Sequence, residues 1–150
     1  MAMTMKILFA VDGSGYTKKA AEFLSTHFNW FKTVPELHVL HVKLPIPRGL
    51  ALVQAEQIVG SSGIESYYRD EAESALKPAE EILRNHNIPF QWTYRVGDIA
   101  KEICTYASEN HVDMIVMGSH GHRALENVLL GSVATRVLAM TPGIPVLIVR

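Results

Sequence analysis

Short apolar segments alternate with amphipathic ones along the whole chain. Five segments have the composition of β-strands, and they cover residues 6–11, 37–42, 90–96, 114–117 and 146–149. The first two and the last two are nearly continuous in Val, Ile, Leu, Phe and Met, which is typical of strands buried on both faces. Residues 14–28, 66–86, 98–110 and 132–140 carry apolar side chains at helical spacing. This βαβ alternation predicts an α/β fold with a five-stranded parallel sheet covered by helices on both faces.

The length and the charge balance exclude several classes of protein. At 150 residues, of which 48% are hydrophobic, the chain is expected to form one domain over residues 1–150. Fourteen basic and fifteen acidic residues give a net charge of -1, which disfavours a nucleic-acid partner. No apolar segment approaches the ~20 residues of a membrane helix, and no signal peptide is recognisable. Cys104 is the single cysteine, which fits a reducing compartment, so we expect a cytoplasmic protein with no membrane partner.

Four local patterns add structural expectations. Pro78 interrupts a helical pattern, so we expect a kink there. Asp98 precedes another helical pattern and is expected to be its N-cap. Residues 44–63 contain two prolines and a Gly-Ser-Ser-Gly cluster, and we expect them to form the one long irregular connection. The alternating polarity of residues 90–96 predicts an edge strand or a less covered one.

Three glycines lie in residues 116–133, VMGSHGHRALENVLLGSV, directly after an expected strand. They match none of the common phosphate or nucleophile motifs. Gly131 and Ser132 lack the lysine of a P-loop, and Lys18 follows the first strand where a dinucleotide fingerprint has its third glycine. Asp12 has no acidic neighbour of the kind a phosphate-receiver site needs, and Ser119 does not have the position of a nucleophile elbow.

The remaining pattern is G-x2-G-x9-G-S, formed by Gly118, Gly121, Gly131 and Ser132. It suits an anion-binding cradle, because glycines let backbone amides approach a ligand and a helix N-terminus carries free N–H groups. We expect Ser132 to cap that helix and to donate its hydroxyl. A glycine-rich turn followed by an ordinary capped helix fits the same residues, so the pattern alone leaves both interpretations open.

The spacing of these glycines and the segments around them resemble the ATP-binding branch of the universal stress protein family. The resemblance covers essentially the whole chain. It is carried by KILFAVDGS at the start, ELHVLHV in the second strand, and VDMIVMGSHG, LLGSVATRVL and IPVLIV towards the end. It implies a single-domain, three-layer α/β/α sandwich of the flavodoxin-like type, with strand order 3-2-1-4-5.

The resemblance also implies which residues bind the nucleotide. Asp12, with Ala10 and Val11, matches the positions against ribose and adenine, and the backbone of Val42 matches the position that meets the adenine. The positions that hold ribose and phosphates match Gly118, Gly121, Gly131, Ser132 and Val133, and Met117 precedes them. Mg or Mn is expected with the ATP, with Asp12 as the one carboxylate nearby. A homodimer through the last strand, Val146–Val149, is implied too, and an apolar edge strand does need to be covered.

Three functions stay open at this point. The first is an ATP-binding, dimeric module in stress response or signalling. The second is a slow ATPase or a phosphoryl-transfer, autophosphorylating protein, for which only Asp12 and His120 are available as candidate groups. The third is an interaction protein whose cradle holds nothing.

The other histidines are assigned structural roles or left open. His38 and His41 lie three apart in a strand and therefore face opposite sides, so we expect a packed and a strand-end histidine rather than a metal pair. His120 and His122 flank Gly121, where contact with a phosphate or a metal and exposure to solvent are both open.

Overall fold

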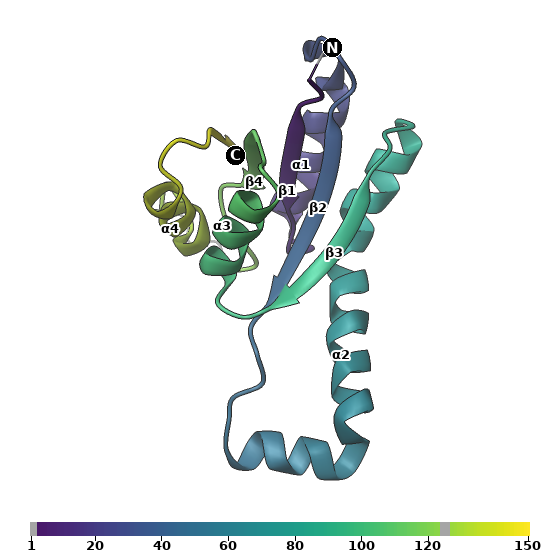
Figure 1. The fold of residues 1–150 in the computed structure, drawn as a ribbon, viewed down its shortest axis with the longest axis vertical. Coiled ribbons are helices and arrows are strands. Elements are labelled where there is room, and N and C mark those ends of the chain that lie inside the picture. The colour runs from purple at the N-terminus through teal and green to yellow at the C-terminus, as the bar shows by residue number, and fades with distance from the viewer. Residues whose placement is uncertain (1–2, 124–126) are drawn as a thin grey trace.

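The computed structural model describes residues 3–123 and 127–150, so residues 124–126 of the nine-residue spacer in the glycine motif lie outside it. Its elements follow one another in the expected alternation (Figure 1). They are β1 (Lys6–Ala10), α1 (Gly15–Thr26), the 3-10 helix η1 (Phe28–Trp30), β2 (Glu36–Lys43), α2 (Leu50–Asn85), β3 (Gln91–Val96), α3 (Ile99–Glu109), β4 (Met114–Gly118), α4 (Ser132–Met140) and β5 (Val146–Val149). The strands form one parallel sheet in the order β3-β2-β1-β4-β5. The expected α/β fold and strand order are therefore confirmed, with β3 at an edge as predicted.

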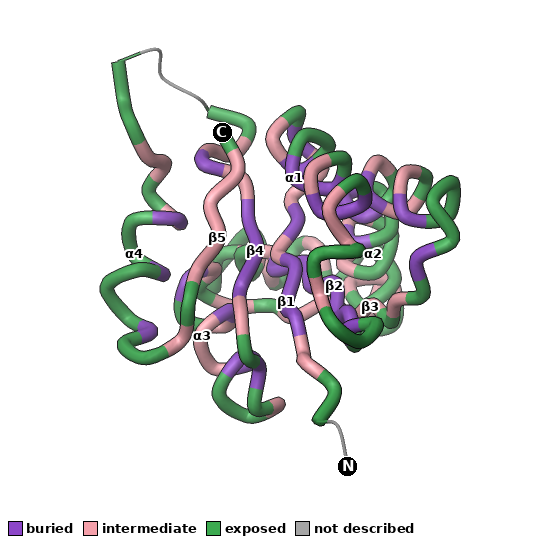
Figure 2. The backbone as a smooth tube through the Cα atoms, turned by 90° about the horizontal axis from the view of Figure 1, so that it is seen from above, coloured by how far each residue is buried: buried purple, intermediate pink, exposed green. Residues whose placement is uncertain are grey.

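Each face of the sheet has its own apolar core. Because side chains alternate along a strand, Ile7 and Phe9 of β1 pack with α1 and α2, while Leu8 packs with α3 and α4. Figure 2 shows the sheet between these two pairs of helices. All three side chains are fully buried, which explains why the first strand reads as an unbroken apolar run.

The topology opens a crevice at the carboxyl end of the central strands. β1 lies between β2 and β4, and its last residue, Ala10, pairs with Met117 of β4. The chain leaves β1 towards α1 on one face of the sheet and leaves β4 towards α4 on the other. Ligands of open α/β sheets bind where neighbouring connections diverge in this way.

The predicted irregular connection over residues 44–63 is wrong for most of its length, because α2 begins at Leu50. Residues 50–59 are mostly good helix formers, but none of them is buried, so they show no apolar stripe against the core. The only non-helical dihedral angles inside α2 are those of Gly60, with φ 73° and ψ 174°, whereas Pro78 lies within the helix. The sharp bend lies at Gly60, and Figure 1 shows the first segment of α2 turned away from the second; the kink expected at Pro78 stays a prediction.

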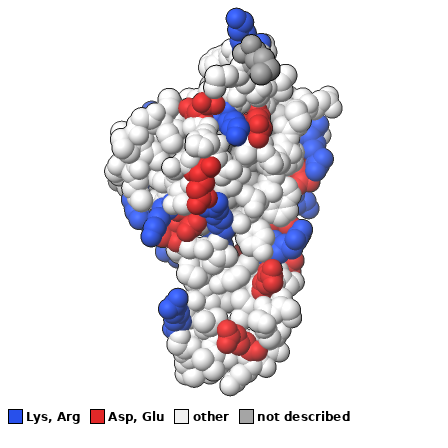
Figure 3. Space-filling model, viewed as in Figure 1, with Lys and Arg blue, Asp and Glu red and all other residues white. Residues whose placement is uncertain are grey.

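Charges of both signs are interspersed on the face of the molecule shown in Figure 3. Some opposite charges also pair, since the Arg95 guanidinium contacts the carboxylates of Glu102 and Glu109 at 3.6 and 2.7 Å. The lower part of the same view, around the first segment of α2, carries few charges. Among the described residues, no helix combines the length and the hydropathy that crossing a membrane requires.

Candidate functional site

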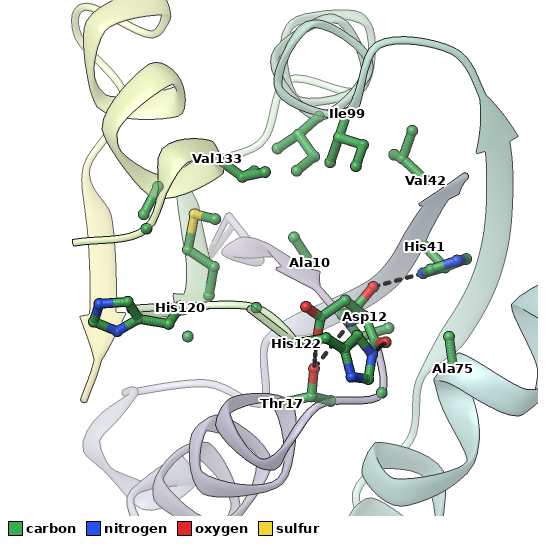
Figure 4. A pocket seen from close by; sticks show the side chains of 18 of the residues that line it. Ala10, Asp12, Thr17, His41, Val42, Ala75, Ile99, His120, His122 and Val133 are labelled. Carbon is green, nitrogen blue, oxygen red and sulfur yellow. Dashed lines mark hydrogen bonds between the residues drawn. The ribbon is translucent and has the colours of Figure 1, made fainter. Parts of the chain in front are cut away.

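A pocket of about 720 Å³ lies in the crevice at the carboxyl ends of β1, β2 and β4 (Figure 4). Most of its lining comes from the end of β1, the end of β2, and the segment from β4 to the start of α4, and α1, α2 and α3 add further side chains. All the predicted binding residues line it, namely Ala10, Val11, Asp12, Val42, Met117, Gly118, Gly121, Gly131, Ser132 and Val133. The structure thus brings together residues that lie more than a hundred positions apart in the sequence.

Asp12 is held by hydrogen bonds on almost every side. Its Oδ1 accepts from the backbone N–H of Ser14 and from the hydroxyl of Thr17, both at 2.9 Å. The same Thr17 hydroxyl accepts from the backbone N–H of Asp12 at 3.0 Å, and the ring of His122 donates from Nε2 to the Asp12 carbonyl at 2.6 Å. Within the described ranges, Oδ2 is the one polar atom of Asp12 without a partner. The fold therefore presents a fixed carboxylate oxygen at the pocket.

The motif glycines are required by close packing between chain segments. A Cβ on Gly118 would lie 2.7 Å from the Cβ of Tyr16, and one on Gly121 would lie 2.7 Å from Oδ2 of Asp12. A Cβ on Gly131 would lie 3.1 Å from the carbonyl oxygen of Ser119. None of the three has a left-handed φ, so their small size matters here rather than their backbone freedom.

Backbone hydrogen bonds join the pocket wall to the edge strand β5. The N–H of Gly131 donates to the carbonyl of Ser119 at 2.6 Å, and the N–H of Ser119 donates to the carbonyl of Val149 at 2.8 Å. Ser119 itself is 1% exposed. The loop between β4 and α4 is therefore fixed at both ends where it meets the pocket.

The N-terminus of α4 faces the pocket without a side-chain cap. Gly131 is the N-cap residue, with extended dihedral angles, and, having no side chain, it makes no side-chain capping bond. The prediction that Ser132 caps this helix is wrong, because the helix begins at Ser132 itself and a cap must precede the first turn. The first-turn N–H groups of α4 carry partial positive charge at this end of the pocket.

Both loop histidines bond to the protein. The ring of His120 contacts the hydroxyl of Ser119 through Nδ1 at 2.9 Å and the carbonyl of Val128 through Nε2 at 2.6 Å. His122 closes the loop onto the end of β1 through its bond to Asp12. These contacts give both residues a structural role in shaping the pocket. Contact of either histidine with a ligand stays a prediction.

Several lining residues were missed by sequence reasoning. Ile99 and Ile103 of α3 form an apolar wall opposite Asp12, and their spacing after the N-cap Asp98 is the signal that could have identified them. Lys43 lines the pocket with its Nζ 3.3 Å from Oε2 of Glu71 in α2. No local pattern marks this pair, because it forms only when α2 packs beside β2.

The two histidines of β2 lie apart, as expected. His38 contacts the Tyr106 hydroxyl and the Glu36 carboxylate, both at 2.7 Å. His41 contacts the carbonyl of Val11 through Nδ1 at 2.8 Å and lines the pocket. The expected packed histidine is His38, whereas the pocket position of His41 was not foreseen.

The pocket has two chemically different regions. In Figure 4, Val133, Ile99 and Val42 lie along one wall, and Asp12 with Thr17 and His122 lies opposite. The glycine loop and the α4 N-terminus supply backbone N–H groups, whereas the α3 side supplies an apolar surface. Such a pocket suits a ligand with a flat apolar part and an anionic part.

The chain matches one protein family over nearly its whole length. The profile of the Universal stress protein family matches residues 3–150. Universal stress protein YxiE of Bacillus subtilis is 31% identical, and the alignment covers 99% of this chain and 100% of that protein. The solved structure of MJ0577 from Methanocaldococcus jannaschii is similar with a TM-score of 0.75 at 26% identity, over 99% of this chain and 96% of the other.

A further solved structure shares the fold. It is a universal stress protein from Archaeoglobus fulgidus in complex with dAMP, with a TM-score of 0.66 at 21% identity, over 99% of this chain and 100% of the other. From the profile match and the similarity to YxiE, the chain belongs to the universal stress protein family.

Proposed function

We propose that this protein binds an adenine nucleotide, ATP in particular, in the pocket at the carboxyl end of the sheet. The observation that carries the proposal is the convergence of ten residues from three chain segments on one cavity. That dAMP is bound by the related protein from Archaeoglobus fulgidus supports the same class of ligand.

The two regions of the pocket suit the two parts of a nucleotide. The apolar wall of Val42 and Ile99 suits the faces of adenine, and the free Oδ2 of Asp12 suits a ribose hydroxyl. The phosphates would then meet Gly131, Ser132 and the N-terminus of α4, where backbone N–H groups compensate negative charge. In this arrangement a triphosphate needs few basic side chains.

A divalent ion, Mg or Mn, fits as a companion of the phosphates. Among residues 3–123 and 127–150, no three His, Cys, Asp or Glu side chains cluster in a way suited to hold a metal by themselves. Mg²⁺ in nucleotide sites is often held by one or two carboxylates, the phosphates and water. Asp12 is the carboxylate in a position to contribute, through Oδ2.

Binding is favoured over catalysis as the function of this pocket. The alternative, a slow ATPase or an autophosphorylating protein, needs a positioned base. Of the two candidates, His120 contacts the protein through both ring nitrogens, at Ser119 and at Val128, and Asp12 is assigned above to the ribose and the divalent ion. The protein is therefore proposed to be a cytoplasmic stress-response or signalling module whose state depends on bound nucleotide.

We also propose a homodimer formed through β5. Within the described residues, Val146–Val149 pairs with β4 on one side only, so its other edge leaves backbone groups unpaired. A second copy of the chain can pair with this edge. Light scattering after size-exclusion chromatography is expected to give twice the mass of the chain, and a monomeric mass would contradict this part of the proposal.

The first test is to identify the nucleotide that accompanies the purified protein. After denaturation and removal of the chain, chromatography and mass spectrometry are expected to find ATP at about one per chain. ADP or AMP would indicate turnover or another natural ligand. An empty protein that also fails to bind Mg-ATP in calorimetry would refute the proposal.

A matched pair of glycine variants makes this test specific for the pocket. Gly121→Val is expected to abolish binding, because its Cβ would lie 2.7 Å from Oδ2 of Asp12. Gly15→Val serves as the control, since a Cβ at Gly15 meets nothing within 4 Å. Equal affinity for ATP in both variants would show that the nucleotide binds elsewhere.

A further inference from the structure

His41 carries a buried ring nitrogen that has no partner in the protein. The residue is 8% exposed, and its Nδ1 lies 2.8 Å from the carbonyl oxygen of Val11. A carbonyl only accepts, so Nδ1 carries the proton. In a neutral imidazole the other nitrogen, Nε2, is then an acceptor.

Nε2 is reached from the pocket. No hydrogen bond joins it to any residue in the described part of the chain. Among these residues, the Ser25 hydroxyl is the one side-chain nitrogen or oxygen that is both fully enclosed and without a hydrogen-bond partner. Nε2 of His41 also lacks a partner, so it must be at least partly accessible to solvent. Because His41 is nine-tenths buried and lines the pocket, we infer that a ligand in the pocket can reach Nε2. Figure 4 shows the ring between the end of β2 and α2, on the side of Ala75.

The neighbouring charges leave this acceptor available for a ligand. Lys43, the basic residue on the same side of the pocket, is paired with Glu71 at 3.3 Å. Ala75 brings no polar side chain to this part of the wall. A ligand group that faces Nε2 must therefore donate a hydrogen bond. An acceptor on the ligand would place its lone pair against the lone pair of Nε2.

The position of His41 selects the part of the ligand that meets it. The anion-binding groups lie at the N-terminus of α4, whereas His41 lies next to Val42 at the end of β2, with its ring on the α2 side of the strand. A nucleotide whose phosphates lie at α4 directs its base towards β2. The group at this end is then an edge of the base and not a phosphate.

We propose that His41 determines base specificity, by accepting a hydrogen bond at Nε2 from the exocyclic amino group of a 6-aminopurine. The inference rests on the proposed nucleotide-binding function. It predicts that the pocket selects adenine over hypoxanthine, because hypoxanthine replaces the amino donor with a carbonyl acceptor. A buried acceptor left without its donor weakens binding, so the expected preference for ATP over ITP is about tenfold or more.

The test compares ATP and ITP by calorimetry in the wild type and two variants. His41→Phe keeps a ring but removes the acceptor, and it is expected to lose most of the preference for ATP. His38→Phe is the matched control, because His38 is a second buried histidine on β2 that does not line the pocket. Its ratio of affinities is expected to equal that of the wild type.

A ligand-side measurement keeps the proposal testable if His41→Phe does not fold. In the wild type, N6,N6-dimethyl-ATP lacks the donor hydrogens and is expected to bind about tenfold more weakly than ATP. The ¹⁵N resonance of His41 Nε2 is expected to shift when ATP binds. Equal affinity of the wild type for ATP and ITP, or an unchanged ratio in His41→Phe, would overturn the role of His41. Failure of both nucleotides to bind the wild type would instead refute the proposed function.

Discussion

Replacing Thr17 with valine tests whether the hydroxyl of this residue anchors Asp12. Thr17 is 3% exposed, and valine differs from threonine mainly in lacking the hydroxyl. That hydroxyl accepts from the Asp12 N–H at 3.0 Å and donates to its Oδ1 at 2.9 Å. In Thr17→Val, the backbone N–H of Asp12 therefore loses its acceptor, and Oδ1 of Asp12 loses one of its two donors.

The expected cost follows from these two hydrogen bonds. A bond to a charged group contributes about 1.5–3 kcal/mol and a neutral one about 0.5–1.5 kcal/mol. Because both bonds share one hydroxyl and Asp12 is partly exposed, we expect Thr17→Val to lose about 2–3 kcal/mol of unfolding free energy. With a urea slope of about 2 kcal/mol/M, the unfolding midpoint falls by about 1–1.5 M.

Urea unfolding followed by circular dichroism measures this loss, with Thr141→Val as the control. Thr141 is 8% exposed, but within the described residues its hydroxyl makes one hydrogen bond, to the carbonyl of Val137 in the preceding helix α4 at 2.7 Å. Its loss is expected to be about 1 kcal/mol or less. Equal midpoints in the two variants would refute the reasoning that Thr17 holds Asp12. Calorimetry with ATP adds a second readout, because a carboxylate that is no longer held should bind the ligand more weakly.

Three further predictions concern residues away from the pocket. Asp98→Ala removes the N-cap bond to Lys101 N at 3.0 Å, and we expect about 1 kcal/mol lower stability in thermal unfolding; no loss would argue against the cap. A hydrogen bond from His38 lowers the pKa of Glu36 below its usual 4.5. Its stabilising contribution is therefore present above pH 4.5 and lost as the pH falls through the lower folded-state value, so Glu36→Gln should cost more at pH 7 than at pH 3; a cost independent of pH would contradict this. Burial raises the pKa of the Cys104 thiol, so a thiol-specific reagent should label the native protein much more slowly than the urea-unfolded one, and equal rates would show that the thiol is accessible.

The strands could be predicted from sequence because their signal is local. Each predicted strand agrees with an observed one to within about a residue, since burial on both faces selects apolar side chains at the central positions of β1 and β4. The first segment of α2 could not be predicted in the same way. Its side chains Leu50, Val53 and Ile58 are exposed, so no periodic pattern relates them to a core.

The candidate site was predictable where a motif carries it and not where packing creates it. The glycine pattern identified Gly118, Gly121 and Gly131. The reason why glycine is needed there, close contact with neighbouring segments, is visible only in the folded structure. His41 was assigned to the strand end, because nothing in the local sequence tells that α2 leaves a cavity beside it. The capping of α4 was misjudged by one residue, which is the usual uncertainty at helix ends.

The bend at Gly60 divides α2 into parts with different local stability. No residue of α2 before Ala72 is buried, so opening of the first segment breaks helical hydrogen bonds but exposes little additional apolar surface. The part that contains Ala79 and Leu83 packs in the core and can open only when the sheet loses its cover. Amide hydrogens of residues 50–59 are thus expected to exchange through local opening, and those near Leu83 only through global unfolding.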